Sequence, residues 1–73
     1  MNLSIKMLHV KEDKQVTIQK NNTLITVTNK EGERLFFKLF TKETIGQELT
    51  NIINNHIYNG YIMLTIDELK FDN

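Results

Sequence analysis

Hydrophobic and polar residues alternate along the middle of the chain, which is the pattern of β-strands with one buried face. The alternating apolar positions are Val16 and Ile18 before Asn21-Asn22, and Ile25 and Val27 after it. Asparagine tolerates the positive φ that both positions of a two-residue type I′ turn require, so we expect a hairpin with Asn21-Asn22 as its loop. This loop sets Ile18 opposite Ile25, and the four apolar side chains then share one face.

A second turn follows in the sequence TNKEGERLFFKLF. A three-residue loop that ends at Gly32 places the glycine at the left-handed position of a bulged hairpin and pairs Asn29 with Glu33. Residues 15 to 40 are thus predicted to form a three-stranded meander. Uninterrupted alternation turns three further side chains toward the inner face: Leu35, Phe37 and Leu39.

Apolar residues then recur at helical spacing at Ile45, Leu49, Ile52, Ile53 and Ile57. Either Thr41 or Thr44 can cap this helix, and Asn59-Gly60 supplies its end. Gly46 costs about 1 kcal/mol relative to alanine in a helix interior, and close packing on the sheet is one reason for a glycine there.

The two ends of the chain complete the pattern. YIMLTI, from Tyr61, alternates again and predicts a strand, and LSIKMLHV near the N-terminus predicts another with Leu3, Ile5 and Met7 inward, although a helix also fits there. Residues 67–73 form an acidic tail that is either loose or docks on a partner.

The chain is therefore predicted to be a single α+β domain, residues 1–73. We expect a mostly antiparallel sheet of about five strands in the order β-β-β-β-α-β, with one helix packed on one face.

Composition narrows the function. The 73 residues include no cysteine, and nine basic side chains balance nine acidic ones. A chain this small needs help to stabilise its core, and without disulfides oligomerisation is the natural route. The balanced charge lacks the basic excess of a duplex-DNA binder. No apolar run spans a bilayer and no signal-peptide pattern opens the chain, so we expect a cytoplasmic protein without membrane contact.

Catalytic and metal-binding patterns are weak. His9 and His56 lie 47 positions apart without metal-ligand spacing, and Ser4 has no nucleophile motif around it. His56 falls near the predicted end of the helix, where a histidine interacts favourably with the helix dipole. We therefore expect neither an enzyme nor a cofactor or metal.

The remaining anomaly is apolar side chains on the face predicted to be open to water. In the expected register this face carries Leu24, Phe36, Phe40, Tyr61 and Met63. Exposed apolar patches on small proteins usually mark a contact surface. These five residues form the candidate interface, unless the termini fold over them.

Three function classes fit. The first is a small non-enzymatic modulator or inhibitor that binds a host protein, as a homodimer. The second is a single-stranded nucleic-acid binder that stacks bases on the aromatic rings and contacts phosphates through Lys20, Arg34 and Lys38. The third is an oligomer that holds a small ligand between subunits. No motif identifies a family, and the richness in lysine, asparagine and isoleucine resembles short phage and prophage proteins of AT-rich Gram-positive bacteria.

Overall fold

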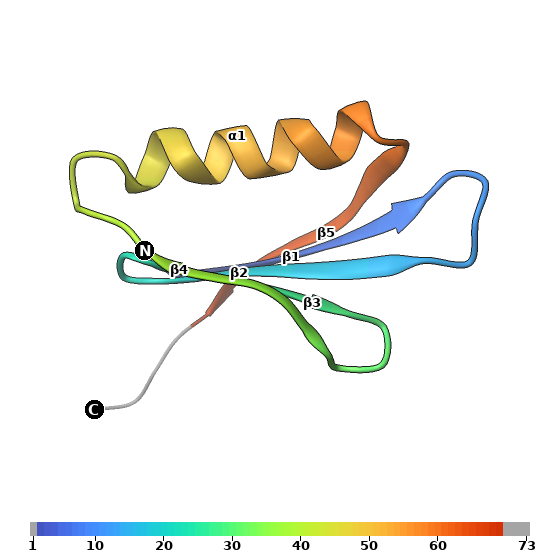
Figure 1. The fold of residues 1–73 in the computed structure, drawn as a ribbon, viewed down its shortest axis with the longest axis horizontal. Coiled ribbons are helices and arrows are strands. Elements are labelled where there is room, and N and C mark those ends of the chain that lie inside the picture. Colours follow the sequence, from blue (N-terminus) through green and yellow to red (C-terminus); the bar gives the residue numbers. More distant parts are fainter. Residues whose placement is uncertain (1, 70–73) are drawn as a thin grey trace.

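The computed structural model describes residues 2–69 and has two layers, a five-stranded sheet and one helix (Figure 1). The elements in chain order are β1 (Asn2–His9), β2 (Gln15–Asn21), β3 (Leu24–Asn29), β4 (Arg34–Leu39), α1 (Ile45–Tyr58) and β5 (Tyr61–Leu69). This confirms the predicted α+β class and element order. The predicted tail begins inside β5, and residues 70–73 lie outside the described part.

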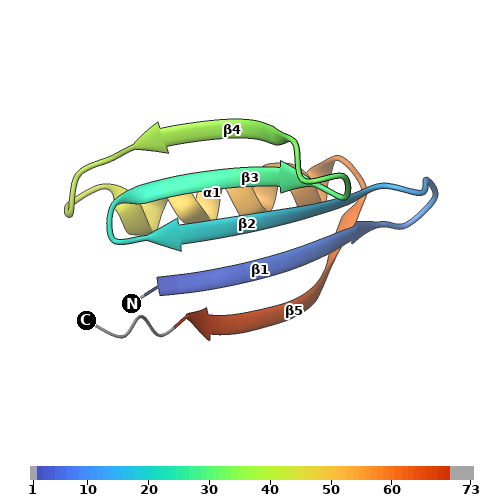
Figure 2. The same cartoon turned by 90° about the horizontal axis from the view of Figure 1, so that it is seen from below.

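The strands lie in the order β4-β3-β2-β1-β5, and every neighbouring pair is antiparallel. β4 and β5 therefore form the two edges of the sheet. Both edges also run in the same direction, because three antiparallel steps separate β4 from β1 and one separates β1 from β5 (Figure 2).

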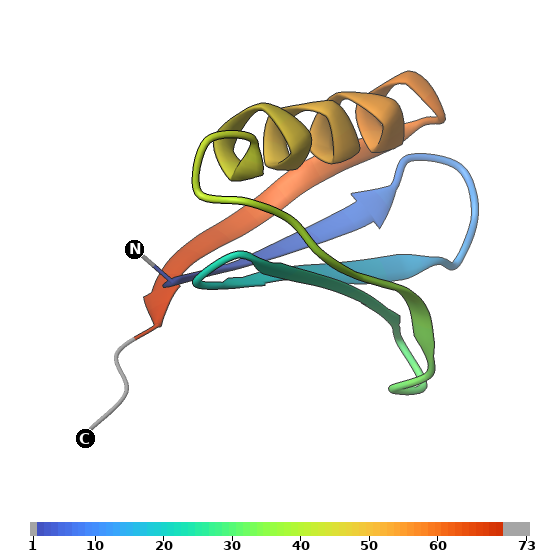
Figure 3. The same cartoon turned by 60° about the vertical axis from the view of Figure 1, so that its left-hand side comes forward.

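The core lies between α1 and the sheet, and the other face of the sheet is not covered by any described element (Figure 3). The three central strands each supply two alternate side chains, as their period-two pattern predicts. The buried residues are Ile5, Met7, Val16, Ile18, Ile25, Val27, Ile45 and Leu49. The N-terminal segment is thus the predicted strand, with Ile5 and Met7 inward.

The loop of the first hairpin lies one residue further along the chain than predicted. The loop is Asn22-Thr23, so Ile18 pairs with Val27 rather than with Ile25. Only Asn22 in this loop has positive φ, at 56°, so the turn is not type I′. Each side chain nevertheless stays on the predicted face of the sheet. The partner of every β2 residue shifts by two positions along β3, and an even shift leaves the facing unchanged.

The second turn matches its prediction. Gly32 has φ of +86°, and the Asn29 N–H donates to the Glu33 carbonyl oxygen at 2.9 Å. The Asn29 side chain adds a reason for this geometry, because its Oδ1 accepts the backbone N–H groups of Glu31 and Glu33.

The helix begins at Ile45 and ends before Gly60, which has φ of +97°. Thr44, one of the two predicted caps, occupies the N-cap position, but its side chain makes no capping bond. Thr44 N–H instead donates to Thr41 Oγ1 in the preceding turn. A Cβ at Gly46 would meet no atom within 4 Å, so close packing does not explain this glycine.

Replacing Gly46 with alanine is therefore expected to stabilise the protein by roughly 0.5 to 1 kcal/mol, because it restricts the unfolded chain and improves helix propensity. Urea unfolding measures the change. Gly60→Ala is the matched control and should destabilise, because its Cβ would lie 2.7 Å from His9 Nε2 at a left-handed φ. A loss of stability in Gly46→Ala would contradict this account of the helix start.

Candidate functional site

One extra residue in β4 decides which of its side chains face the helix. Thr28 pairs with Arg34. The next pair is Val27 with Phe36, so Leu35 is an inserted residue that forms a β-bulge. Because side chains alternate along a strand, one inserted residue exchanges the two faces for every position that follows.

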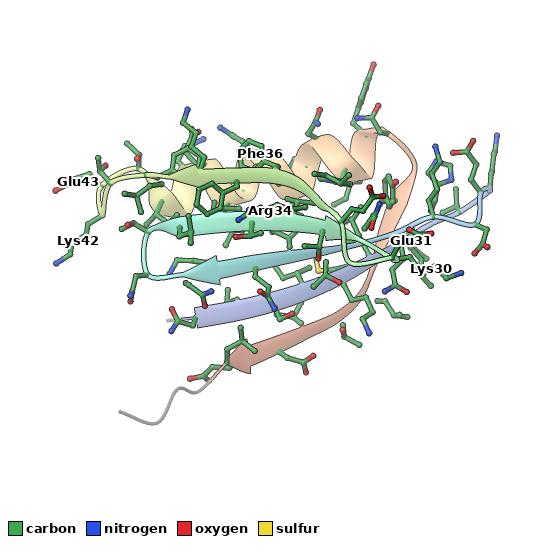
Figure 4. All side chains as sticks on the ribbon, turned by 60° about the horizontal axis from the view of Figure 1, so that its bottom comes forward. Lys30, Glu31, Arg34, Phe36, Lys42 and Glu43 are labelled. Carbon is green, nitrogen blue, oxygen red and sulfur yellow. The ribbon has the colours of Figure 1, made fainter. Side chains whose placement is uncertain are left out.

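The bulge overturns the predicted orientation of β4. Phe36 shares the helix side with its buried partner Val27, and Phe40 packs against the core on that side. Phe37 and Leu39 lie on the open face instead. The sequence analysis predicted the opposite face for each of these residues, because it continued the alternation past the turn without a bulge. Figure 4 labels Phe36 and Arg34, which leave β4 on opposite sides.

The prediction also places Tyr61 and Met63 on the open face, and this too is wrong. Met63 pairs with the buried Met7, and Tyr61 packs against the core. A second register shift inserts Leu64 into β5. Of the five candidate interface residues, Leu24 alone lies on the open face.

Tyr61 lies between the two histidines, which the sequence does not indicate. Its ring makes edge-on contacts with His9 and His56, at centroid separations of 5.1 and 5.3 Å. His56 Nδ1–H donates to the carbonyl oxygen of Ile52 at 2.8 Å. His56 therefore packs and hydrogen-bonds near the end of the helix.

His9 joins the turn after β1 to the turn after α1. Its Nδ1 accepts the backbone N–H groups of Lys11 and Glu12, and its Nε2–H donates to the Asn59 carbonyl oxygen. Both ring nitrogens are engaged, which leaves no lone pair for a metal ion. Within residues 2–69, no three His, Cys, Asp or Glu side chains group together as metal ligands.

A groove of about 460 Å³ lies between β4 and α1. Its lining is apolar at Val27, Leu35, Phe36, Phe40 and Ile52, and polar at Lys38, Glu48, Asn51, Asn55 and His56. The inward rotation of Phe36 and Phe40 by the bulge supplies much of the apolar lining. The groove thus opens directly beside an edge strand of the sheet.

The edge strand itself is exposed along its whole length. Every residue of β4 is exposed, and the open-face side chains of Phe37 and Leu39 are 57% and 69% accessible. Apolar side chains thus leave β4 on both faces, a composition typical of a strand covered on both sides. The run LFFKLF carried this signal in the sequence, although the predicted interface omitted Phe37 and Leu39.

Unpaired backbone groups accompany these side chains. The Phe40 N–H donates to the Thr23 carbonyl oxygen at 2.8 Å, toward β3. Because the bonding direction alternates from residue to residue in an antiparallel pair, the backbone N–H and C=O groups of Phe37 and Leu39 point to the open edge. Such a row of free groups is a template for an added strand.

The three predicted phosphate contacts do not form one surface. Arg34 stacks over Phe37 on the open face, with 4.7 Å from Cζ to the ring centroid. Lys38 lies on the helix side, 5.2 Å from the Phe40 ring. Lys20 also lies on the helix side, but two strands away in β2, paired with Ile25.

The ion pairs of the described residues gather at the turns and not at the edges. Lys14 pairs with Glu12 at 3.1 Å, and Lys30 pairs with Asp13 at 3.0 Å. The hydrogen bond from Lys14 lowers the pKa of Glu12, and the same bond raises the pKa of Lys14. These exposed pairs connect turn residues and contribute little stability.

No family model, curated protein or solved structure matches the chain. No helix formed by residues 2–69 is long and apolar enough to cross a membrane. The arrangement that stands out is therefore the β4 edge with its adjoining groove.

The exchange of faces can be tested by two matched substitutions. Phe36→Ala should cost about 2 kcal/mol, because this ring is 38% exposed and lines the groove, whereas Phe37→Ala should cost less than about 1 kcal/mol. Denaturant unfolding measures both. Equal losses, or a larger loss for Phe37→Ala, would contradict the bulge at Leu35.

Proposed function

We propose that this protein is a small interaction module that takes up an extended segment of a protein partner at the edge of β4. The observation that carries the proposal is an edge strand with free backbone groups, exposed apolar side chains on both faces and a groove beside it. Strand addition to such an edge gives affinity through backbone hydrogen bonds and specificity through pockets for alternate side chains.

The groove has the position needed for those side chains. An added strand next to β4 would turn every second side chain toward α1, where Phe36, Phe40 and Ile52 offer apolar contact and Asn51 and Asn55 offer hydrogen bonds. Its other side chains would meet the open-face apolar residues of β4. The partner segment is therefore apolar on both faces.

Charge adds a second requirement. The only charged residues of β4 are Arg34 and Lys38, and neither makes an ion pair with any residue that the structure describes. An acidic residue on each face of the partner segment would complement them. The module acts by occupying its partner, as a modulator or inhibitor of the phage type does, and the proposal assigns it no catalytic step.

A small ligand in the groove is the second candidate, because 460 Å³ lies within the usual size of ligand sites. Such a ligand would contact side chains and not the open edge of β4. The two candidates therefore respond differently to loss of the outward backbone groups.

Leu39→Pro removes one outward N–H without breaking a bond to β3, and proline is tolerated at such edge positions. We expect partner capture from a lysate of the source cells to fall at least about tenfold, which corresponds to about 1.4 kcal/mol. Leu39→Ala, which loses the same side chain but keeps the N–H, should retain most of the capture.

Thermal unfolding of both variants checks that each is folded. Equal capture by the two variants would contradict strand addition. A small molecule that binds both variants as tightly as the native protein would favour the groove alone.

A further inference from the structure

β5, the other edge strand of the sheet, has the properties proposed above for a segment that binds at β4. Ile62, Met63, Leu64 and Ile66 of β5 are all exposed, with Ile66 58% accessible. The charged residues of β5 are Asp67 and Glu68, and neither makes an ion pair within residues 2–69. β5 is thus an apolar, extended and acidic segment.

We infer that β5 of one copy of this chain pairs with β4 of a second copy, so that copies associate head to tail. This inference rests on the proposed role of β4 as a strand acceptor and names the occupant. The carrying observation is complementary charge on two strands that are both apolar and both at an edge. The two cations of β4 and the two anions of β5 form no ion pair with any residue between Asn2 and Leu69.

Strand direction is compatible with this contact. β4 and β5 run the same way in the sheet (Figure 2). A second copy placed beside the first by translation therefore presents β5 parallel to β4, with both helices on the same side. Sheets that mix parallel and antiparallel pairs are common.

The backbone of β5 also has free groups at the right positions. In β1 the His9 N–H bonds toward β2 and the Val10 N–H bonds to Gly60, so the even-numbered residues of β1 bond toward β5. Their partners in the second half of β5 are Thr65, Asp67 and Leu69. The backbone groups of Ile66 and Glu68 consequently point to the open edge.

One parallel register satisfies backbone, faces and charges together. With Ile66 beside Phe36, the outward groups of Ile66 and Glu68 lie on either side of those of Phe37. Glu68 then comes beside Lys38 on the helix side. Asp67 then lies beside Phe37 on the open face, whose ring carries the Arg34 guanidinium. Leu69 lies beside Leu39. A shift by one residue would lose all of these matches.

Charge reversal tests the contact directly. Arg34→Glu with Lys38→Glu, and separately Asp67→Lys with Glu68→Lys, should each weaken association at least about tenfold, because like charges then face each other. The chain with all four changes has its original net charge and the complementary pattern inverted, so its association should return to the native level.

The measurement is the solution mass by light scattering over a range of protein concentrations. The native chain should exceed its monomer mass of 8.6 kDa and grow with concentration, since a head-to-tail contact leaves one edge free at each end. Lys6→Glu with Lys11→Glu is the matched control, because it changes net charge equally to the first variant but lies outside both edges. It should behave as the native chain.

Three results would overturn the inference. The first is a native mass that stays at 8.6 kDa at all concentrations. The second is a chain with all four substitutions that dissociates as much as the two double variants do. The third is weaker association in the β5 double variant alone, which would mean that β5 pairs with itself. In each case the Leu39→Pro and Leu39→Ala capture experiment still decides whether β4 accepts a different protein.

Discussion

The two-residue period of a β-strand is the constraint on which both edges of this sheet depend. An inserted residue at Leu35 turns Phe36 and Phe40 toward α1 and leaves Phe37 and Leu39 outside. An insertion at Leu64 has the same effect in β5, where Met63 faces inward beside Met7. Without these bulges the groove beside β4 would lose its aromatic lining. Lys38, which follows the first bulge, and Asp67 and Glu68, which follow the second, would change faces.

The helical layer is too small to cover the whole sheet. A single helix of 14 residues covers the central strands, whose six alternating side chains are almost completely buried, while both edge strands remain exposed. Natural sheets usually protect their edges with charge, proline or a covering element. This chain contains no proline, and the charges on its edges are of one sign on β4 and the opposite sign on β5. Edges of this kind are suited to pairing rather than protected from it.

The sequence predicts the type and order of every element, because periods of two and of 3.6 are distinct over segments of this length. It also predicts the glycine turn at Gly32, which needs a left-handed residue. It cannot place the bulges. Leu35 and Leu64 each belong to a run of three consecutive apolar residues, 35–37 and 62–64. Alternation therefore fits either face, and only pairing with Val27 and Met7 decides between them. The predicted facing of Phe36, Phe40, Tyr61 and Met63 is wrong for this reason, although the apolar excess that suggested an interface is present in both edge strands.

Amide hydrogen exchange of β4 tests the central claim most directly, because the claim concerns hydrogen bonds at an open edge. At low protein concentration the outward N–H groups of Phe37 and Leu39 should exchange rapidly while the inward N–H groups of Phe36 and Lys38 are protected. At high concentration, or with a captured partner, Phe37 and Leu39 should become protected as well. Outward amides of β4 that stay unprotected when the protein is assembled or bound would contradict strand addition at this edge.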